Sequence, residues 1–450
     1  MDNMFKSCND LTSLDLSNFN TAKVTDMNYM FYNCNELKSL DITSFNTAKV
    51  TNMSNMFYGC SALTSLDITS FNTAEVTNMS YMFHSCYALK SLDLTNFNTA
   101  KVENMGWMFK SCYALTSLDI TSFNTANVKD MTQMFYNSNA LTTIYASDNF
   151  VTSKVTTSIN KSINMFEGCK NLKGAIKYAG NNTNDKDYAN YKTGYFSKLV
   201  GKNGDEKIGA TGETLTAESL ALDDNKDFVA YEPFAAKTAS YKRTMKAGTT
   251  WGTLCLPFEV SLDGQDFRAF KLLSANDATN TIVLEEITTS IAAGTPVIIK
   301  MNEGATELNF SETNKDIAKD AQTTATADNN YQLQGLYAKK VFVKDTDDNC
   351  YIVKGNKLMN PSKLLENAST KHVNSKPFRA YMVDNTSSAA GAKMFSIGFD
   401  DDSTTAIDNL NTIADDNAEY YDLQGHRLNA PQKGVNIVKR GGKTMKVIIK

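Results

Sequence analysis

The chain has 450 residues with a formal net charge of −4, and 42% of its residues are hydrophobic. This length suffices for two or three domains with sizeable cores, and the near balance of charge argues against nucleic acid as the partner. No run of about 18 apolar residues occurs, so no segment is expected to span a membrane.

A repeat organises the first part of the chain. A Met-Phe pair recurs every 26 residues, and a seventh pair follows an insertion of five residues. The pairs begin at Met4, Met30, Met56, Met82, Met108, Met134 and Met165. A fixed period of this length indicates a solenoid, in which each unit buries its apolar face only by stacking on its neighbours.

The second repeat shows the expected elements of one coil. Apolar residues from Val24 to Cys34 follow the spacing of one helix face, and Leu37–Ile42 ends with the alternation of a short strand. Phe45 then begins a turn towards the next coil. We therefore expect an α/β solenoid of helix–strand coils, with the strands on the concave side because helices are wider than strands.

The motifs L-x-x-L-D-[IL], MFxxC and SFNTAxVTxM resemble the BspA-type leucine-rich repeats of bacterial and protist surface proteins. The resemblance covers about residues 1–175. It implies a leucine-rich repeat solenoid that serves as a surface adhesion or ligand-binding module without catalytic activity. Such solenoids generally bind their ligands on the concave side.

The concave strands are the predicted ligand-binding face. Each aspartate there follows a buried leucine, so strand alternation directs it outward beside small hydroxyl residues. The predicted ligand-binding residues are Ser39, Asp41, Thr43, Ser65, Asp67, Thr69, Ser91, Asp93, Thr95 and Asp119. This uniform polar row suits a glycan or an extended polypeptide. The row could also bind Ca²⁺, or its hydroxyl groups could simply solvate the carboxylates.

The opposite face of the coils is the competing choice, because aromatic residues are common anchors of interfaces. Its aromatic residues are Tyr29, Tyr32, Tyr58, Tyr81, Tyr87, Trp107, Tyr113 and Tyr136. The alternative is that half-buried rings only cover the helix edges. His84 occupies a variable position of this face, where we expect a surface residue.

Cysteine also recurs at one position of the repeat. The series is Cys8, Cys34, Cys60, Cys86, Cys112 and Cys169, with Ser138 substituting once. A disulfide ladder or a strip of metal ligands would be the chemical interpretation. We instead expect reduced, buried thiols, because packed helices are too far apart for disulfides and a straight row does not converge on a metal.

Met1 aligns with Met27, so the sequence begins inside a coil. We interpret residue 1 as a truncated or misplaced start, with any export signal upstream. Restoring an upstream coil should then stabilise the solenoid, because its first coil would gain a neighbour.

Residues 201–402 form the second predicted domain, after a solenoid with its cap at 1–200. Short β-rich runs separated by Gly, Asn and Asp predict an antiparallel sandwich or barrel. The runs are Thr250–Phe258, Ala269–Leu273, Thr281–Ile287, Thr295–Lys300, Tyr331–Leu333, Lys340–Lys344, Cys350–Val353, Phe378–Val383 and Met394–Phe399. TWGTLCLPF and AGTPVIIK resemble a β-domain that follows leucine-rich repeats in secreted proteins of Gram-negative anaerobes.

The C-terminal part is expected to be an acidic linker, 403–417, and a small β module, 418–450. Residues 400–417 hold six Asp and no basic residue, whereas 418–450 have a net charge of +5. The pattern YDLQGHRL…KGVNIVKRGGKTMKVIIK predicts three short strands and is similar to C-terminal sorting domains of type IX secretion. Asn436 stands where that family commonly has an aromatic residue. The alternative is a β tail that only packs on its neighbour.

No catalytic signature is found, because none of the three histidines has a Cys, Ser or carboxylate partner at a motif spacing. We expect a non-enzymatic, monomeric binding or adhesion protein, secreted or on the outer cell surface, without cofactor or metal. Its partner would be a host or bacterial surface protein or a glycan. The alternatives are a glycan-active enzyme with its site in the β-rich domain and a structural surface-layer component.

Overall fold

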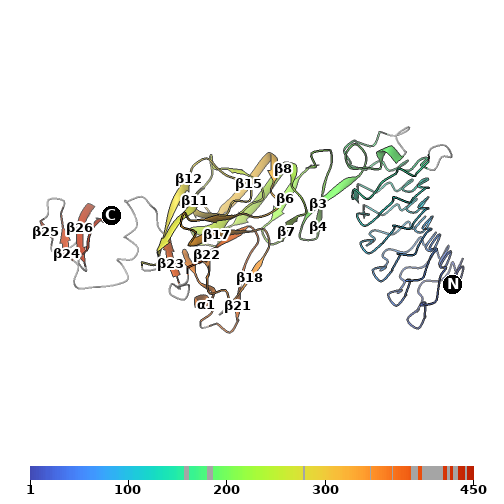
Figure 1. Ribbon diagram of the computed structural model, residues 1–450, viewed down its shortest axis with the longest axis horizontal. Coiled ribbons are helices and arrows are strands. Elements are labelled where there is room, and N and C mark those ends of the chain that lie inside the picture. Colours follow the sequence, from blue (N-terminus) through green and yellow to red (C-terminus); the bar gives the residue numbers. More distant parts are fainter. Residues whose placement is uncertain are drawn as a thin grey trace. The chain divides into compact units, whose positions relative to one another are not determined.

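The computed structural model describes residues 1–156, 162–179, 186–276, 279–344, 346–366, 368–386, 394–397, 419–422, 426–428, 434–440 and 443–449 (Figure 1). The chain divides into two compact units. The first unit comprises Met1–Leu220, Val229–Ala239 and Thr313–Ile317. The second comprises Ala221–Phe228, Ser240–Glu312 and Ala318–Lys450. No helix among the described residues is long and apolar enough to cross a membrane.

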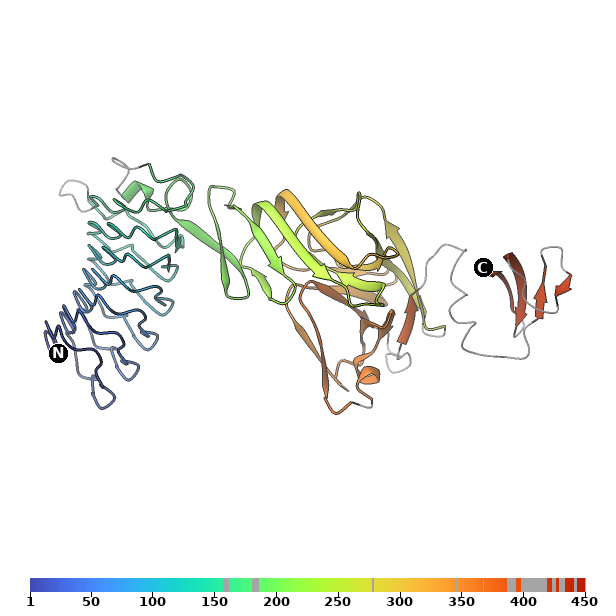
Figure 2. The ribbon, with the colours of Figure 1, turned by 180° about the vertical axis from the view of Figure 1, so that it is seen from behind.

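The repeats form a solenoid of flat coils (Figure 2), and their described residues contain no helix, so the predicted α/β helix–strand coil is wrong. Where a helix was expected, the chain makes successive tight turns, with Met30 N donating to Met27 O and Cys34 N to Phe31 O. Alternate amides bond to the next coil instead: Phe31 N lies 2.9 Å from Met56 O. The coil is therefore built from β-type links between repeats.

Two left-handed residues in each coil prevent a helix. Tyr29 and Asn33 have φ values of 56° each, and the equivalent Asn55 and Gly59 have 58° and 71°. A right-handed helix cannot contain such residues. Apolar residues at helical spacing still point inwards, because Met27, Met30, Phe31 and Cys34 are all fully buried. The helical spacing of the apolar residues therefore predicted correctly which side chains are buried, but it predicted the wrong backbone conformation.

Identical side chains stack from coil to coil and form the core of the first unit. The Phe31 and Phe57 rings are parallel, with centroids 5.6 Å apart, and the stack continues to Phe166. The buried Thr47 hydroxyl donates to Asn72 O at 2.9 Å and accepts from Asn72 N at 2.7 Å. This threonine of the FNT motif joins consecutive coils, which explains its recurrence.

The first unit continues into a five-stranded sheet. A strand was expected in every coil, but the described residues of the repeats form two, β1 (Ser117–Asp119) and β2 (Thr143–Ala146), which pair in parallel. β3 (Ser197–Asn203) follows the short 3-10 helix η1 (Lys186–Tyr188) and pairs with β2, β4 (Glu206–Ala210) and β7 (Phe228–Ala230). Tyr195 and Phe196 pack edge-on against Phe166, closing this end of the core.

A four-stranded sheet contains β15 (Glu307–Ile317), β8 (Phe234–Thr244), β5 (Thr216–Ala217) and β6 (Leu220–Asp223). Strands β8 and β15 contribute residues to both units.

The second unit contains a ten-stranded sheet. Its order is β16 (Thr323–Ala325), β17 (Tyr331–Leu336), β22 (Arg379–Asp384), β19 (Cys350–Lys354), β20 (Lys357–Met359), β23 (Met394–Ile397), β12 (Thr281–Ile287), β11 (Phe267–Asn276), β14 (Val297–Met301) and β9 (Trp251–Leu254). Two-stranded sheets pair β10 (Val260–Ser261) with β13 (Ser290–Ile291) and β18 (Lys340–Val343) with β21 (His372–Ser375). The helix α1 (Pro361–Leu364) begins after Asn360, which caps Ser362 N.

All nine predicted β-rich runs of this region contain a strand. The expected antiparallel arrangement has two parallel exceptions among the described strand pairs of this region, β12 with β23 and β5 with β8. Phe310 of β15 packs edge-on against Phe267 of β11, with ring centroids 5.8 Å apart, so this part of β15 contacts the ten-stranded sheet. Tyr241 of β8 stacks on the same Phe310 ring.

The C-terminal module forms four strands instead of the three expected. They are β24 (Glu419–Tyr421), β25 (Arg427–Leu428), β26 (Gly434–Arg440) and β27 (Lys443–Ile449), in the order β25-β24-β26-β27. The predicted acidic linker, 403–417, lies outside the described residues.

Candidate functional site

The predicted polar row lies on the surface of the first unit. Ser39, Asp41, Thr43 and their equivalents in the next two coils are all exposed. In each coil one carboxylate oxygen accepts two hydrogen bonds: Asp41 Oδ1 lies 3.1 Å from Thr43 N and 2.7 Å from Thr43 Oγ1. The other oxygen, Oδ2, has no hydrogen-bond partner among the described residues. Each aspartate therefore stabilises a local turn and retains an oxygen for solvent or a ligand.

Hydrogen bonds favour the ionised form of the carboxylates in the polar row. Hydrogen bonds from the Thr43 hydroxyl and backbone lower the pKa of Asp41, while Asp15 and Asp67 act in the opposite direction. The pKa values of Asp67 and Asp93 are lowered by the equivalent threonines. Within the described part of the chain, no group of three or more His, Cys, Asp or Glu side chains could hold a metal ion.

Asp119 differs from the other predicted ligand-binding residues. Its side chain is only 8% exposed, and Lys207 Nζ of β4 lies 2.5 Å from its Oδ2. Its Oδ1 accepts from Thr121 Oγ1 at 2.6 Å. Both oxygens are thus occupied within the first unit, so we remove Asp119 from the candidate ligand-binding residues.

A second feature is a column of aromatic rings on the turns where helices were expected. We define the aromatic column as Tyr29, Tyr32, Tyr58, Tyr81, His84 and Trp107. The Tyr32 and Tyr58 rings stack at 4.6 Å, Tyr58 and His84 at 4.4 Å, and Tyr81 and Trp107 at 4.6 Å. All six side chains are half-buried, so their faces pack on one another and their edges meet solvent.

Tyr29, Tyr81 and Trp107 of this column have left-handed backbones, with φ values of 56°, 59° and 61°. A bulky residue in this region carries strain that Asn or Gly would reduce. The equivalent residue of the third repeat is in fact Asn55. The coil therefore does not require an aromatic residue at this position.

The histidines differ in part from expectation. His84 is half-buried instead of lying freely on the surface, Ser85 Oγ lies 2.8 Å from its Nδ1, and burial lowers its pKa to about 4. His372 belongs to β21. His426 Nδ1 lies 2.9 Å from Asp422 Oδ2, a contact that the motif search missed.

The cysteines are free thiols, and all but Cys8 are buried. Sγ of Cys60 donates to Phe31 O at 3.2 Å, and Cys86 and Cys112 repeat this bond. Burial raises the pKa of Cys112 and Cys169 to about 12. The expectation of reduced, buried thiols is confirmed except at Cys8, and such protonated thiols are poor nucleophiles and metal ligands.

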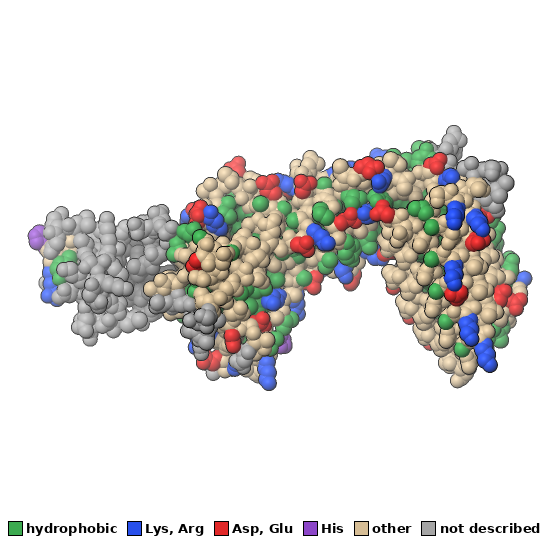
Figure 3. Space-filling model, in the orientation of Figure 1, with side chains coloured by type: hydrophobic (Ala, Val, Ile, Leu, Met, Phe, Trp, Pro, Cys, Tyr) green, Lys and Arg blue, Asp and Glu red, His purple; other side chains and the backbone are tan. Residues whose placement is uncertain are grey.

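Charged side chains gather along one flank of the repeats (Figure 3). Lys101 pairs with Glu75 at 2.7 Å and Lys129 with Glu103 at 2.8 Å, each across one coil step. All four side chains are at least half exposed, so these pairs contribute little to stability.

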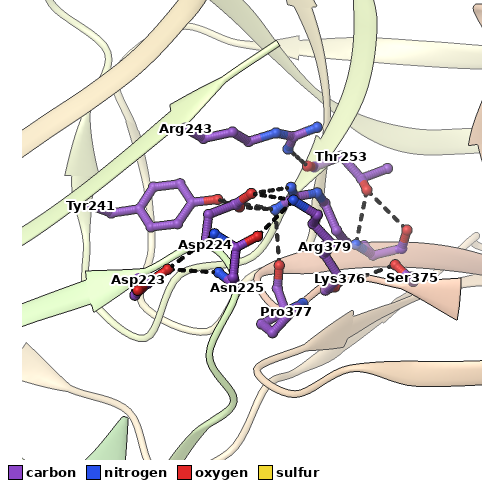
Figure 4. A network of polar contacts seen from close by, with 11 residues as sticks. Asp223, Asp224, Asn225, Tyr241, Arg243, Thr253, Ser375, Lys376, Pro377 and Arg379 are labelled. Atoms are coloured by element: carbon purple, nitrogen blue, oxygen red, sulfur yellow. Dashed lines mark hydrogen bonds and ion pairs between the residues drawn. The ribbon is translucent and has the colours of Figure 1, made fainter. Parts of the chain in front are cut away.

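In the second unit, sequence reasoning missed a polar network around Asp224 (Figure 4). Asp224 and Arg379 are 155 positions apart in the sequence, so no local motif predicts their contact. Tyr241, Arg243 and Lys376 complete the network. Only the pairing of distant strands and loops brings these residues together.

Comparison with known proteins bears only on the repeat. A family model described as "Mycoplasma protein of unknown function, DUF285" matches residues 1–94 and 64–179. No curated protein and no solved structure matches the chain. The solenoid is therefore similar to a repeat family whose description states no function.

Proposed function

We propose that this chain is a secreted or cell-surface binding protein whose solenoid recognises a protein or glycan through its polar row. The observation that carries the proposal is the exposure of the same Ser-Asp-Thr set in three consecutive coils. Core packing explains the repetition of buried residues. The turn bond between Asp and Thr explains the recurrence of those two residues, but neither it nor core packing explains the recurrent exposed serine.

The chemistry of the row supports a repetitive partner. Each coil presents one free carboxylate oxygen and one serine hydroxyl, and hydrogen-bonded coils follow one another at about the 4.8 Å spacing of β-strands. A glycan or an extended polypeptide with donor groups at a similar repeat could contact several coils at once. Such multivalent contact strengthens binding without any single strong site.

Surface location is the part of the proposal that depends on resemblance. The repeat motifs resemble BspA-type leucine-rich repeats, and the C-terminal pattern resembles type IX sorting domains. Export through that C-terminal module, and adhesion as the role of the exported protein, follow from these resemblances.

The aromatic column is the second candidate for the binding surface. Its specific support is the left-handed backbone of Tyr29, Tyr81 and Trp107, which stability alone does not favour. Stacking already immobilises these rings, so they would lose little entropy on contact with a protein partner.

The test is a screen of glycans and matrix proteins with three forms of the whole chain. Charge reversal by Asp67→Lys with Asp93→Lys should abolish the binding that the unchanged protein shows. A variant carrying Tyr58→Ser and Tyr81→Asn should retain it, as should the flank control Lys49→Glu. Circular dichroism checks that each variant is folded.

Two results would contradict the proposal. Loss of binding only in the tyrosine variant would place the site on the aromatic column. Absence of any saturable ligand, together with hydrolysis of a glycan or ordered self-assembly, would favour the enzymatic or surface-layer alternative.

A further inference from the structure

Figure 4 shows two carboxylates, Asp223 and Asp224, near the basic residues Arg243, Arg379 and Lys376 of the second unit. The Arg379 guanidinium donates two hydrogen bonds to the Asp224 carboxylate, from Nη1 to Oδ1 at 2.6 Å and from Nη2 to Oδ2 at 3.0 Å. The Tyr241 hydroxyl donates to Oδ1 at 2.5 Å, and Lys376 Nζ lies 3.6 Å from Oδ2. Arg379 and Asp224 are only 12% and 15% exposed. The carboxylate of Asp224 is therefore fully engaged.

Arg243 enters the same network from β8, two residues beyond Tyr241. Its Nη1 donates to Thr253 O at 2.8 Å. Its Nη2 lies over Gly252, where an added Cβ would come within 3.3 Å. The groups that contact this guanidinium, the Thr253 carbonyl and the Tyr241 hydroxyl, carry no charge. No carboxylate among the described residues forms a salt bridge with Arg243.

Burial and the neighbouring positive charge disfavour the protonated form of the Arg243 guanidinium. Burial and the neighbouring Arg379 lower the pKa of Arg243 to about 10, although Asp224 partly opposes this shift. Asp223 does not supply the missing charge, because it lies 3.8 Å from Lys226 and caps Asn225 N. Two largely buried guanidinium groups, Arg243 and Arg379, thus lie near one buried carboxylate, which leaves one buried positive charge in surplus, and the more exposed Lys376 adds to the positive potential.

A largely buried guanidinium without a direct ion-pair partner is costly, and a bound anion is the simplest group to provide one. A guanidinium with free donors suits an oxyanion, because it can donate two parallel hydrogen bonds to it. With Arg379 and Lys376 nearby, a tetrahedral oxyanion fits better than a single carboxylate, because it offers acceptor oxygens and negative charge in more than one direction.

We propose that Arg243, with Arg379 and Lys376 beside it, forms a binding site for a phosphate or sulfate group. Arg243 supplies the direct hydrogen bonds. Arg379, held by Asp224, and Lys376 supply positive potential. This site lies within the second unit and does not depend on the binding proposed for the solenoid.

The experiment is calorimetric titration of the full chain with sodium phosphate, sodium sulfate and sodium acetate at one ionic strength held with sodium chloride. At least one dianion should bind saturably and about tenfold or more tightly than acetate. Whichever of phosphate and sulfate binds more tightly identifies the oxyanion that the site prefers.

The variant Arg243→Gln should weaken binding of that dianion by at least about tenfold. Arg268→Gln is the matched control, because Arg268 is exposed and forms its own forked pair with Glu286, and it should keep full affinity. Without an oxyanion, Arg243→Gln should melt no lower than the unchanged protein, because it removes a charge that lacks a counter-ion.

Absence of saturable dianion binding, equal affinity for acetate, or unchanged affinity in Arg243→Gln would each overturn the proposal. If Arg243→Gln does not fold, Arg243→Lys takes its place, because lysine keeps the positive charge but cannot donate two parallel hydrogen bonds to one oxyanion. Unchanged dianion affinity in Arg243→Lys would then overturn the role of the guanidinium.

Discussion

Single residues of the solenoid have roles that their recurrence alone does not reveal. The Asp of each strand motif accepts bonds from the Thr two residues later, the Thr of the FNT motif joins coils, and the Cys donates to a carbonyl of the preceding coil. Left-handed positions are occupied by Asn, Ser or Gly in some coils and by aromatic residues in others. Their repetition therefore reflects hydrogen bonding and backbone shape as well as apolar burial.

Gly59 offers a test of the left-handed coil. Gly59→Ala should destabilise the first unit by the about 1–2 kcal/mol of a left-handed alanine plus the cost of rotating the Asn33 side chain, because the new Cβ would lie 2.3 Å from Asn33 Oδ1. Gly264→Ala is the control, with a similar φ of 70° and nothing within 4 Å of its Cβ. Chemical denaturation measures both losses, and equal losses would contradict the predicted clash.

Buried thiols predict a loss of stability at alkaline pH. An unfolded thiol loses its proton near pH 8.5, whereas burial raises the pKa of Cys34 to about 11 and of Cys112 to about 12. The unfolded chain therefore binds fewer protons above pH 8.5, and stability falls until the folded thiols ionise, by about 1.4 kcal/mol per pH unit for each thiol.

Denaturation at several pH values between 8 and 11 checks this fall. A triple variant, Cys60→Ser, Cys86→Ser and Cys112→Ser, should show a shallower fall. Ser138 already occupies this position once and donates to Phe109 O at 2.6 Å, so serine is compatible with the coil. In the unchanged protein at pH 8, a thiol reagent should modify the exposed Cys8 first. An identical pH dependence in both proteins would exclude the thiols as its cause.

At the scale of elements, the largest difference from expectation is the coil itself. Stacked turns satisfy the same apolar spacing as a helix, while their free amides bond to the neighbouring coil. The expected difference in width between helices and strands is absent, so the inference that the polar row is concave loses its basis. The row is exposed all the same, and its proposed role depends on that exposure.

The salt bridge between Lys207 of β4 and Asp119 of β1 provides a prediction about how these two strands are held together. Lys207→Met should destabilise the first unit by about 1–3 kcal/mol, because it leaves the buried carboxylate of Asp119 without its charged partner. Lys101→Met, which breaks an exposed pair of similar length, should change stability by at most about 0.5 kcal/mol. Comparable losses in urea denaturation would refute the structural importance of the Asp119 pair.

At the scale of the whole molecule, each unit has its own hydrophobic core. The first is the stack that runs through Phe31 and Phe166, and the second includes Phe270, Tyr351 and Met382. Separate cores favour separate unfolding, although β8 and β15 belong in part to both units.

Calorimetry of the full chain should therefore show two transitions. Met382→Ala removes a fully buried side chain and should lower only one of them, by the equivalent of about 2–5 kcal/mol. Gly59→Ala should lower only the other. A single transition that both variants shift equally would show that the two cores unfold together.

The sequence alone determined what depends on local pattern. The 26-residue period predicted a stacked solenoid, its apolar positions predicted the buried core, and the β-rich runs located the strands of the second unit. These features follow from burial and strand propensity, which neighbouring residues are sufficient to express.

Tertiary structure decided what depends on distant partners. The backbone of the coil became turns because amides bond to residues 25 positions away, as Phe31 N does with Met56 O. Asp119 is not available as part of the predicted polar row, because it forms a salt bridge with Lys207. The packing of separate segments brings Asp224, Arg243 and Arg379 together. Local spacing reports which side chains are buried, but hydrogen-bond partners and counter-ions are set only when the chain packs.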